Sequence, residues 1–333
     1  MISEVPARGY RNRAVIQPTK GSNGQWQLSF SRTPTVECVN LQDCLIQSPG
    51  IRHLCVAVQK ALGSEYEAYT PDQNVGALRH IILATNRLPD ENQCRVTLAF
   101  HGPTDIAKIE RFQNNLSDHS KALELYIDEL PKRNAGLMSN PKLVYRSTCF
   151  RPEINERSFQ VSPRSWWTQT PLSFNGLIRS LRRLLNLVTE DRVLEIGCGV
   201  GTVPVSLARS DVSWLGIDHE RSAVVDAQCN ARHLGDRYEF RVGDGEHWLR
   251  KLVGRTHFSV LILHAMRMPF GASFMRLAAA MKPRVVVYIA PNPTALLKDI
   301  EQLTTYTLDE LVLLDHTPGS GHYLTIAVLS QAL

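Results

Sequence analysis

The sequence lacks any CxxC pair and any tight group of cysteines. Its seven cysteines are scattered, at positions 38, 44, 55, 94, 149, 198 and 229. An odd number of separated thiols does not build a disulfide framework and is typical of a reducing compartment. The spacing also argues against a zinc site or an iron–sulfur cluster, so we expect no metal.

Long apolar runs are also missing. No stretch approaches the roughly 20 apolar residues that span a bilayer, and the first residues contain no apolar signal core. We therefore expect no membrane partner and an intracellular protein, either cytoplasmic or, in a eukaryote, in the mitochondrial matrix. Three early arginines suit an organellar presequence, whereas Glu4 argues against one.

Composition and charge exclude little else. The 333 residues, 43% hydrophobic and 21% charged, fit one large or two ordinary globular domains. The formal net charge of +5 is compatible with a nucleic-acid partner but does not require one.

The two halves of the sequence differ in their pattern of predicted helices and strands. Over 1–175, β-prone runs such as RHIILA and CRVTLAF are mixed with helical periodicity, including a helix expected over about 104–130, so we expect an α+β domain. Over 176–333, strands such as VLEIG, SWLGID and VVVYIA alternate with helices. This alternation predicts an α/β domain with a doubly wound parallel sheet, which binds ligands at the carboxyl ends of its strands.

A glycine-rich loop follows the first strand of the second half. Gly197, Gly199 and Gly201 permit a sharp turn and the close approach of a ligand to the backbone. The pattern is ExGxGxG, with Glu195 at the strand end, whereas dinucleotide folds carry GxGxxG.

Acids also end the next two strands. Asp218 is placed to accept hydrogen bonds from ribose hydroxyls, and Asp244 stands where adenine contacts fall in such folds. Together with the loop, these acids favour S-adenosylmethionine (SAM) as the cofactor. NAD and a vestigial empty site remain the alternatives.

Basic and aromatic residues are interleaved between residues 140 and 185. Eight arginines and lysines stand against two acids there. Proteins that bind single-stranded or looped RNA use arginines to contact phosphates and aromatic rings to stack on bases. The alternative is that the tryptophans pack in the hydrophobic core and the arginines lie on a surface exposed to solvent. The candidate RNA contacts of this region are Arg146, Arg151, Arg164, Trp166 and Trp167.

Several segments, in order along the chain, resemble the RNA (uracil-5-)-methyltransferase family of TrmA- and RlmD-like class I SAM-dependent enzymes. GYRNRAVIQ resembles the YRxRxR segment, VLEIGCGVGTVPVSLA the SAM loop and AQCNARHLG the AxxNAxxNG helix. APNPTALLKDI resembles SCNPATLARDL, and LLDHTPGSGHYLTIAVL resembles the final segment around HxE. The resemblance covers most of the chain.

The resemblance implies a Rossmann-like SAM methyltransferase domain and an RNA partner, either rRNA or tRNA, with ribosomal or assembly proteins as further partners. It places Gln169 at the cofactor, and Asn175 and Arg267 on the RNA side. The sequence begins at the family's central domain, so we expect neither the N-terminal OB-like (TRAM) module nor the iron–sulfur cysteines.

Three positions depart from the family's pattern. The family adds a thiolate to carbon 6 of uracil, which makes carbon 5 nucleophilic, and a base later removes the carbon 5 proton. The thiol position corresponds to Pro291, the base to Leu324, and the Asp of the DPPRxG loop to His264. We therefore expect the uracil-5 reaction to be impaired.

Two cysteines and one histidine are candidates to replace the missing groups. Cys198, inside the glycine loop, is expected to be a small buried residue, and Cys149 is a weak candidate for a relocated nucleophile. His264 is either a structural residue or a general base acting on a hydroxyl or exocyclic amine.

Three functions stay open at this point. The first is an RNA-binding relative without methyl transfer, serving as an assembly or modification-complex factor. The second is an active SAM-dependent methyltransferase with a nitrogen or oxygen acceptor. The third is a protein-interaction scaffold.

Overall fold

The chain forms two compact units. The computed structural model describes residues 5–31, 38–70, 77–86, 93–117, 122–130, 137–265 and 268–332. Contacts separate an N-terminal unit, Ala7–Glu153, from a C-terminal unit made of Met1–Pro6 and Ile154–Leu333. The boundary expected between 175 and 176 therefore lies earlier, because Ile154, Phe159 and Phe174 are buried in the core of the C-terminal unit.

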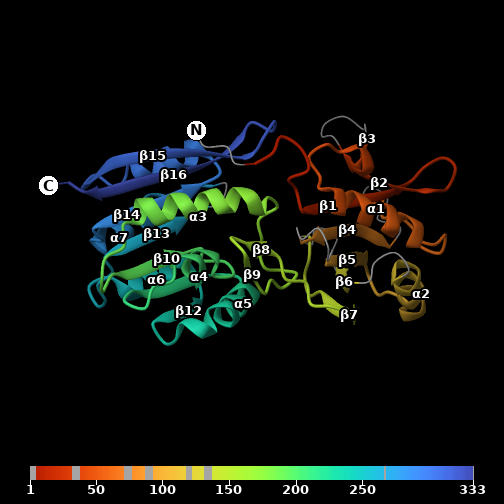
Figure 1. Cartoon of the computed structure of the whole chain (residues 1–333), viewed down its shortest axis with the longest axis horizontal. Helices are drawn as coiled ribbons and strands as arrows, with labels where there is room; N and C mark the ends of the chain where they lie inside the picture. The colour runs from red at the N-terminus through yellow and green to blue at the C-terminus, as the bar shows by residue number, and fades with distance from the viewer. Residues whose placement is uncertain are drawn as a thin grey trace. The chain divides into compact units, whose positions relative to one another are not determined.

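The N-terminal unit is an α+β domain (Figure 1). Its sheet has the order β3-β2-β1-β4-β5-β6-β7. The strands are β1 (Arg13–Lys20), β2 (Trp26–Ser31), β3 (Cys38–Asn40), β4 (Leu78–Thr85), β5 (Cys94–His101), β6 (Leu123–Leu130) and β7 (Lys142–Arg146). The helices are α1 (Pro49–Ala61) and α2 (Ile106–Ser117), with a short 3-10 turn, η1 (Leu41–Asp43).

Helix α1 begins where the sequence supplies a cap. The Ser48 hydroxyl accepts a hydrogen bond from Ile51 N at 3.3 Å, and proline follows at the first helical position. Ile51, Leu54 and Val58 are buried in the same cluster as Phe112 of α2. This burial, at helical spacing, is what holds the helix on the sheet.

The helix expected over 104–130 is wrong in its second half. Helix α2 ends at Ser117, and residues 123–130 form β6, which pairs in parallel with β5 along its whole length. The run LELYIDEL has strong helix formers, but pairing with β5 and the burial of most of its residues override that local preference.

The C-terminal unit is a doubly wound α/β domain, as the sequence predicts. Its sheet order is β12-β11-β10-β13-β14-β16-β15. The strands are β10 (Arg192–Ile196), β11 (Ser213–Asp218), β12 (Tyr238–Val242), β13 (Val260–His264), β14 (Val285–Ala290), β15 (Tyr306–Thr317) and β16 (His322–Gln331). The first five in this order are mutually parallel, and β16 and β15 are antiparallel to their neighbours.

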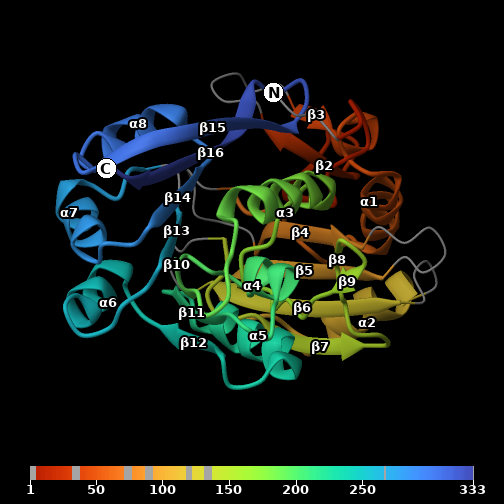
Figure 2. The same cartoon turned by 60° about the vertical axis from the view of Figure 1, so that its left-hand side comes forward.

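Helices cover both faces of this sheet (Figure 2). One layer contains α3 (Pro171–Leu185), α4 (Thr202–Leu207) and α5 (Arg221–Ala231), which is followed by a 3-10 turn, η2 (Arg232–Leu234); the other contains α6 (Gly245–Leu252), α7 (Ala272–Ala280) and α8 (Pro293–Ile300). In β13, Val260 and Ile262 face the first layer, and Leu261 and Leu263 face the second. Burial on both faces explains why these strands read as continuous apolar runs.

Two smaller features complete the fold. The strands β8 (Glu153–Ile154) and β9 (Arg157–Ser158) form a separate short pair. Among the helices that the structure describes, none is both long and apolar enough to cross a bilayer.

Candidate cofactor and methyl-acceptor site

The loop between β10 and α4 is built on glycines in the left-handed region. The φ angles of Gly197, Gly199 and Gly201 are +82°, +54° and +76°. A Cβ at Gly197 would lie 3.0 Å from both the Cβ and the backbone oxygen of His264, and one at Gly201 would lie 3.2 Å from the Cβ of Ala227. At Gly199 a Cβ would meet no atom within 4 Å. Gly199 thus borders open space, where a ligand can approach the backbone closely.

Asp218 ends β11 and holds this loop. Its Oδ2 accepts a hydrogen bond from Gly199 N at 2.8 Å, and its Oδ1 accepts one from Glu220 N at 2.9 Å. Each carboxylate oxygen can accept a further hydrogen bond. The contact of Asp218 with ribose hydroxyls stays a prediction that this geometry permits.

Asp244 lies just beyond β12 and caps helix α6. Its Oδ1 accepts a hydrogen bond from His247 N at 2.9 Å. Only one of its two carboxylate oxygens is used in this bond, so its predicted contact with adenine also stays open.

Glu195 lies buried in β10, and its predicted role at the cofactor stays a prediction. The residue is 0% exposed. Its Oε2 accepts a hydrogen bond from Trp214 Nε1 at 2.8 Å, and its Oε1 lies 2.7 Å from His264 Nε2. Because a carboxylate only accepts, the hydrogen of this second contact belongs to the imidazole. Glu195 therefore orients Trp214 and His264.

The three positions that depart from the family's pattern meet at one edge of the sheet. His264 ends β13, Pro291 follows β14, and Leu324 lies near the start of the antiparallel β16. The register pairs His264 with Ile289, and Ala290 (the residue before Pro291) with Thr325. Of the three, His264 alone carries a group able to accept a proton. Leu324 packs against the hydrophobic core.

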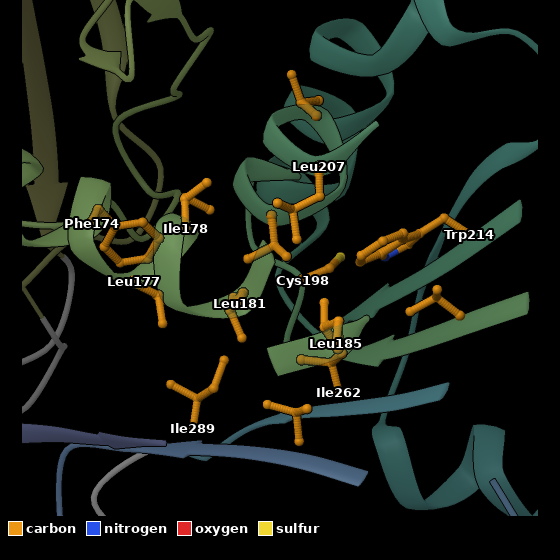
Figure 3. Packing of buried hydrophobic residues seen from close by; sticks show 14 of the residues in the cluster. Phe174, Leu177, Ile178, Leu181, Leu185, Cys198, Leu207, Trp214, Ile262 and Ile289 are labelled. Carbon is orange, nitrogen blue, oxygen red and sulfur yellow. The ribbon is translucent and has the colours of Figure 1, made fainter. Parts of the chain in front are cut away.

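Cys198 points into the core, away from this edge. Figure 3 shows its side chain among aliphatic residues of α3 and close to the indole of Trp214. Burial, together with the charges of Glu195 and Asp218, raises the pKa of the Cys198 thiol well above its ordinary value. The expectation that Cys198 is a small buried residue is confirmed, and its surroundings disfavour the thiolate.

We find no candidate metal site in the described part of the chain. No group of three or more His, Cys, Asp or Glu side chains there is arranged to hold a metal ion. Cys149 is exposed and belongs to the N-terminal unit, and its role as a nucleophile stays a prediction.

Two of the candidate RNA contacts lie in the N-terminal unit. The Nε of Arg146 is 3.0 Å from Glu124 Oε1, and the same guanidinium donates to the Tyr126 hydroxyl at 3.2 Å. Arg151 is exposed. Arg146 is thus part of an ion pair, whereas the Arg151 side chain lies on the surface.

Four further candidates belong to the C-terminal unit. Arg164 forms an ion pair with Glu220 at 2.8 Å. Trp167 is half-buried, whereas Trp166 is 60% exposed. The side chain of Asn175 accepts a hydrogen bond from the backbone of residue 155 at 3.0 Å. Trp166 is therefore the most exposed of these four. Arg267 lies outside the described residues.

Gln169, the predicted cofactor contact outside the glycine loop, is half-buried. Within the ranges that the structure describes, its side chain makes no hydrogen bond. Its role at the cofactor stays a prediction.

Sequence reasoning missed Asp226 of α5. This residue is 0% exposed, and its carboxylate accepts four hydrogen bonds, all from residues 160–165. The available signal was an acid among the buried positions Ala223, Val224 and Ala227 of one helix. A charged residue on a buried helix face indicates hydrogen bonds to a neighbouring segment, because a buried charge is costly without partners.

These features define a class I SAM methyltransferase fold. Residues 187–326 match a family model described as a methyltransferase domain. The tRNA (uracil-54, C5)-methyltransferase of Pyrococcus abyssi, solved in complex with S-adenosyl-L-homocysteine, matches with a TM-score of 0.80 at 19% identity, over 98% of this chain and 78% of that chain.

Curated relatives extend the match along nearly the whole sequence. A protein of Lactobacillus johnsonii named as an uncharacterized RNA methyltransferase is 24% identical over 97% of this chain and 72% of its own length. The 23S rRNA (uracil(747)-C(5))-methyltransferase RlmC of Shewanella oneidensis is 23% identical over 96% of this chain and 83% of its own length. The chain is thus similar to proteins named RNA methyltransferases, a uracil-5 enzyme among them, and the resemblance expected from the sequence is confirmed.

Proposed function

We propose that this protein binds SAM and RNA and is impaired in the uracil-5 reaction of its relatives. One observation carries the proposal: Pro291 and Leu324 stand at the sheet edge where a thiol and a base are required. Carbon 5 of uracil is a poor nucleophile until a thiolate adds to carbon 6. A proline and a leucine supply neither the thiolate nor the later proton acceptor.

The residues at the glycine loop fit SAM. Gly199 leaves open space beside the backbone, and Asp218 at the end of β11 retains accepting capacity for hydroxyl groups. Gln169 and Asp244 are the further side chains that we assign to the cofactor. SAM would supply an electrophilic methyl group at the sheet edge that includes His264.

RNA is the partner that the homologues support, either rRNA or tRNA. In the proposed role the protein holds or remodels structured RNA as an assembly or modification-complex factor, in the cytoplasm or the mitochondrial matrix. Because phosphate contacts release counterions, the affinity should fall steeply with salt.

The test combines binding with nucleoside analysis. The purified protein is titrated with SAM and with structured RNA in a calorimeter, and RNA incubated with SAM is digested and examined for 5-methyluridine. We expect both ligands to bind and no 5-methyluridine to form. Formation of 5-methyluridine would overturn the proposal, and failure to bind either ligand would favour a protein-interaction scaffold.

A second candidate function is methyl transfer to a nitrogen or oxygen of RNA. The observation that favours it is the contact between Glu195 and His264. The Nε2 hydrogen of His264 is directed to the carboxylate, which leaves Nδ1 as a proton acceptor. The His264 side chain is 20% exposed.

In this candidate, an exocyclic amine or hydroxyl attacks the methyl carbon of SAM. A bond forms from the acceptor atom to carbon, the carbon–sulfur bond breaks, and the acceptor's proton passes to His264 Nδ1. Glu195 stabilises the imidazolium that results, as a buried carboxylate does for a catalytic histidine. The products are methylated RNA and S-adenosylhomocysteine, and no covalent enzyme intermediate is needed.

The second candidate is tested by transfer of a labelled methyl group from SAM to RNA. We expect His264→Asn to lower the rate by about 10²–10⁴-fold, the usual contribution of a general base, while SAM affinity is kept. The matched control is His233→Asn, an exposed histidine of η2. Absence of label in RNA with the unmodified protein would eliminate this candidate and leave the first.

A further inference from the structure

Trp166 presents a large aromatic ring to solvent. Its exposed fraction is 60%, and its ring centroid lies 6.0 Å from that of Phe174 at an interplanar angle of 49°. A single exposed apolar residue is ordinary on a protein surface. Trp166 differs because residues 160–165, which directly precede it, are held in place by hydrogen bonds.

Asp226 fixes that segment to helix α5. Its carboxylate accepts hydrogen bonds from Ser162 N at 2.6 Å, Ser162 Oγ at 2.9 Å and Ser165 Oγ at 2.6 Å. A fourth comes from Gln160 Nε2 at 3.2 Å. Burying a carboxylate is costly unless its lone pairs are filled. These four donors all come from the six residues that precede Trp166, so the buried charge holds that stretch in one conformation.

Asn230, one helical turn after Asp226, ties the same segment to the glycine loop. Its Oδ1 accepts from Gln160 N at 2.7 Å, and its Nδ2 donates to Gln160 O at 3.0 Å and to Val200 O at 2.9 Å. Val200 lies inside the glycine loop, between Gly199 and Gly201.

The residues directly before Trp166 are anchored beside Asp218. Arg164 is paired with Glu220 at 2.8 Å, and Ser165 Oγ lies 3.2 Å from the hydroxyl of Ser222. The backbone N–H of Glu220 in turn donates to Asp218. The exposed ring therefore stands on a segment bonded to both sides of the proposed cofactor site.

We propose that Trp166 is a stacking platform for an unpaired RNA base, and that Asp226 is its positioning residue. This inference rests on the proposed RNA binding and identifies the part of the RNA that is recognised. An indole stacks on any base without reading its sequence. Because bases within a duplex are already stacked, the partner is a loop or single strand.

The probe is a labelled RNA hairpin with an unpaired loop, compared with a duplex of its stem, and binding is followed by fluorescence anisotropy. We expect Trp166→Ala to weaken hairpin binding by about 5- to 150-fold, the range for one stacked base, and to leave duplex binding unchanged. Trp166→Phe should retain most of the affinity because it keeps an aromatic face.

Asp226→Asn tests the positioning role. An amide cannot accept all four hydrogen bonds, so the segment should loosen and hairpin affinity should fall. The effect should vanish in the Trp166→Ala background, because Asp226 acts through the ring. The matched control is Asp236→Asn, the same chemical change at an exposed aspartate of the C-terminal unit. Ser165→Ala, which removes one donor, replaces Asp226→Asn if that variant does not fold.

The outcomes separate the two levels of the proposal. If the unmodified protein binds no RNA, the proposed function itself fails. If it binds the hairpin and Trp166→Ala binds equally well, the stacking platform is overturned while RNA binding stands. If the Asp226→Asn effect adds to that of Trp166→Ala, Asp226 is a structural residue and its positioning role is overturned.

Discussion

The imidazole of His264 and the carboxylate of Glu195 lie in contact, with 2.7 Å between Nε2 and Oε1. This contact joins β10, which leads into the glycine loop, to β13, which ends at His264. We call the sheet edge formed by His264, Pro291 and Leu324 the candidate acceptor edge. The indole of Trp214 in β11 occupies the other carboxylate oxygen. One buried charge thus links three neighbouring strands at the point where cofactor and acceptor would meet.

Glu195→Ala should destabilise the C-terminal unit by about 2–6 kcal/mol. The change leaves the N–H groups of Trp214 and His264 without their acceptor in a buried place, which costs about 1–3 kcal/mol for each group. It also opens a small cavity. The measurement is the free energy of unfolding from urea denaturation. Glu239→Gln, at an exposed position of β12, is the control and should change it by less than about 0.5 kcal/mol.

Glu195→Gln gives a finer version of the same test. Its amide oxygen still accepts one hydrogen bond, but its NH₂ group faces the second donor, so we expect a smaller loss of about 1–3 kcal/mol. Equal stability of the alanine variant and the unmodified protein would show that the buried contact contributes nothing.

Gly199→Arg should abolish SAM binding with little loss of stability. The site borders open space, so the arginine side chain enters the volume that we assign to the cofactor. The cost to folding is about 1–2 kcal/mol for a non-glycine residue at φ +54°. Calorimetric titration with SAM measures the effect.

Gly254→Arg is the matched control for this prediction. Gly254 has a φ of +71° and equally open surroundings, but it lies in the turn after α6. The two variants should lose similar stability, and SAM affinity should fall only for Gly199→Arg. Equal SAM affinity of both variants would place the cofactor elsewhere.

Much of this site was predictable from sequence because it depends on strand ends. Periodicity located the carboxyl ends of β10 and β11, and with them the glycine loop and Asp218. The family resemblance placed Pro291 and Leu324, and the sheet register brings the two together. Turns and strand ends can be predicted in this way because they depend on the residues nearby in the sequence.

The side-chain partners were not predictable. Glu195 meets Trp214 and His264 across 19 and 69 positions of sequence. Arg164, a predicted RNA contact, pairs with Glu220 over 56 positions. Such contacts follow from how strands and helices pack, and a single sequence contains no local signal for that packing.

Asp299→Asn should loosen the segment that follows β13. The buried Asp299 carboxylate accepts hydrogen bonds from Phe270 N at 2.6 Å and Gly271 N at 2.9 Å, and from the hydroxyl of Tyr288. Asparagine cannot accept all three, and its NH₂ group opposes at least one donor. Amide hydrogen exchange over residues 268–275 should become faster.

The control for this prediction is Glu301→Gln, at the exposed end of the same helix α8. Exchange over 268–275 should be unchanged there. If Asp299→Asn also leaves exchange unchanged, the carboxylate does not hold this segment, and the position of the candidate acceptor edge is fixed by other contacts.

Asp191 should make the stability of the C-terminal unit sensitive to acid. Burial alone would raise the pKa of this carboxyl, but hydrogen bonds from Arg284, Ser259 and the Val188 N–H lower it below the ordinary value of 3.8. The ionised form is therefore stabilised by folding. This contribution is fully present above pH 3.8, the unfolded value, and is lost as the pH falls through the lower folded value.

Asp191→Asn isolates this contribution. Because Arg284 is partly exposed and remains solvated, we expect a loss of about 1–3 kcal/mol near neutral pH. The difference between the variant and the unmodified protein should stay constant from about pH 7 to pH 5 and shrink below about pH 4. Urea denaturation across this range measures it, with Asp236→Asn as the surface control. A difference that grows as the pH falls would mean that folding raises the pKa of Asp191.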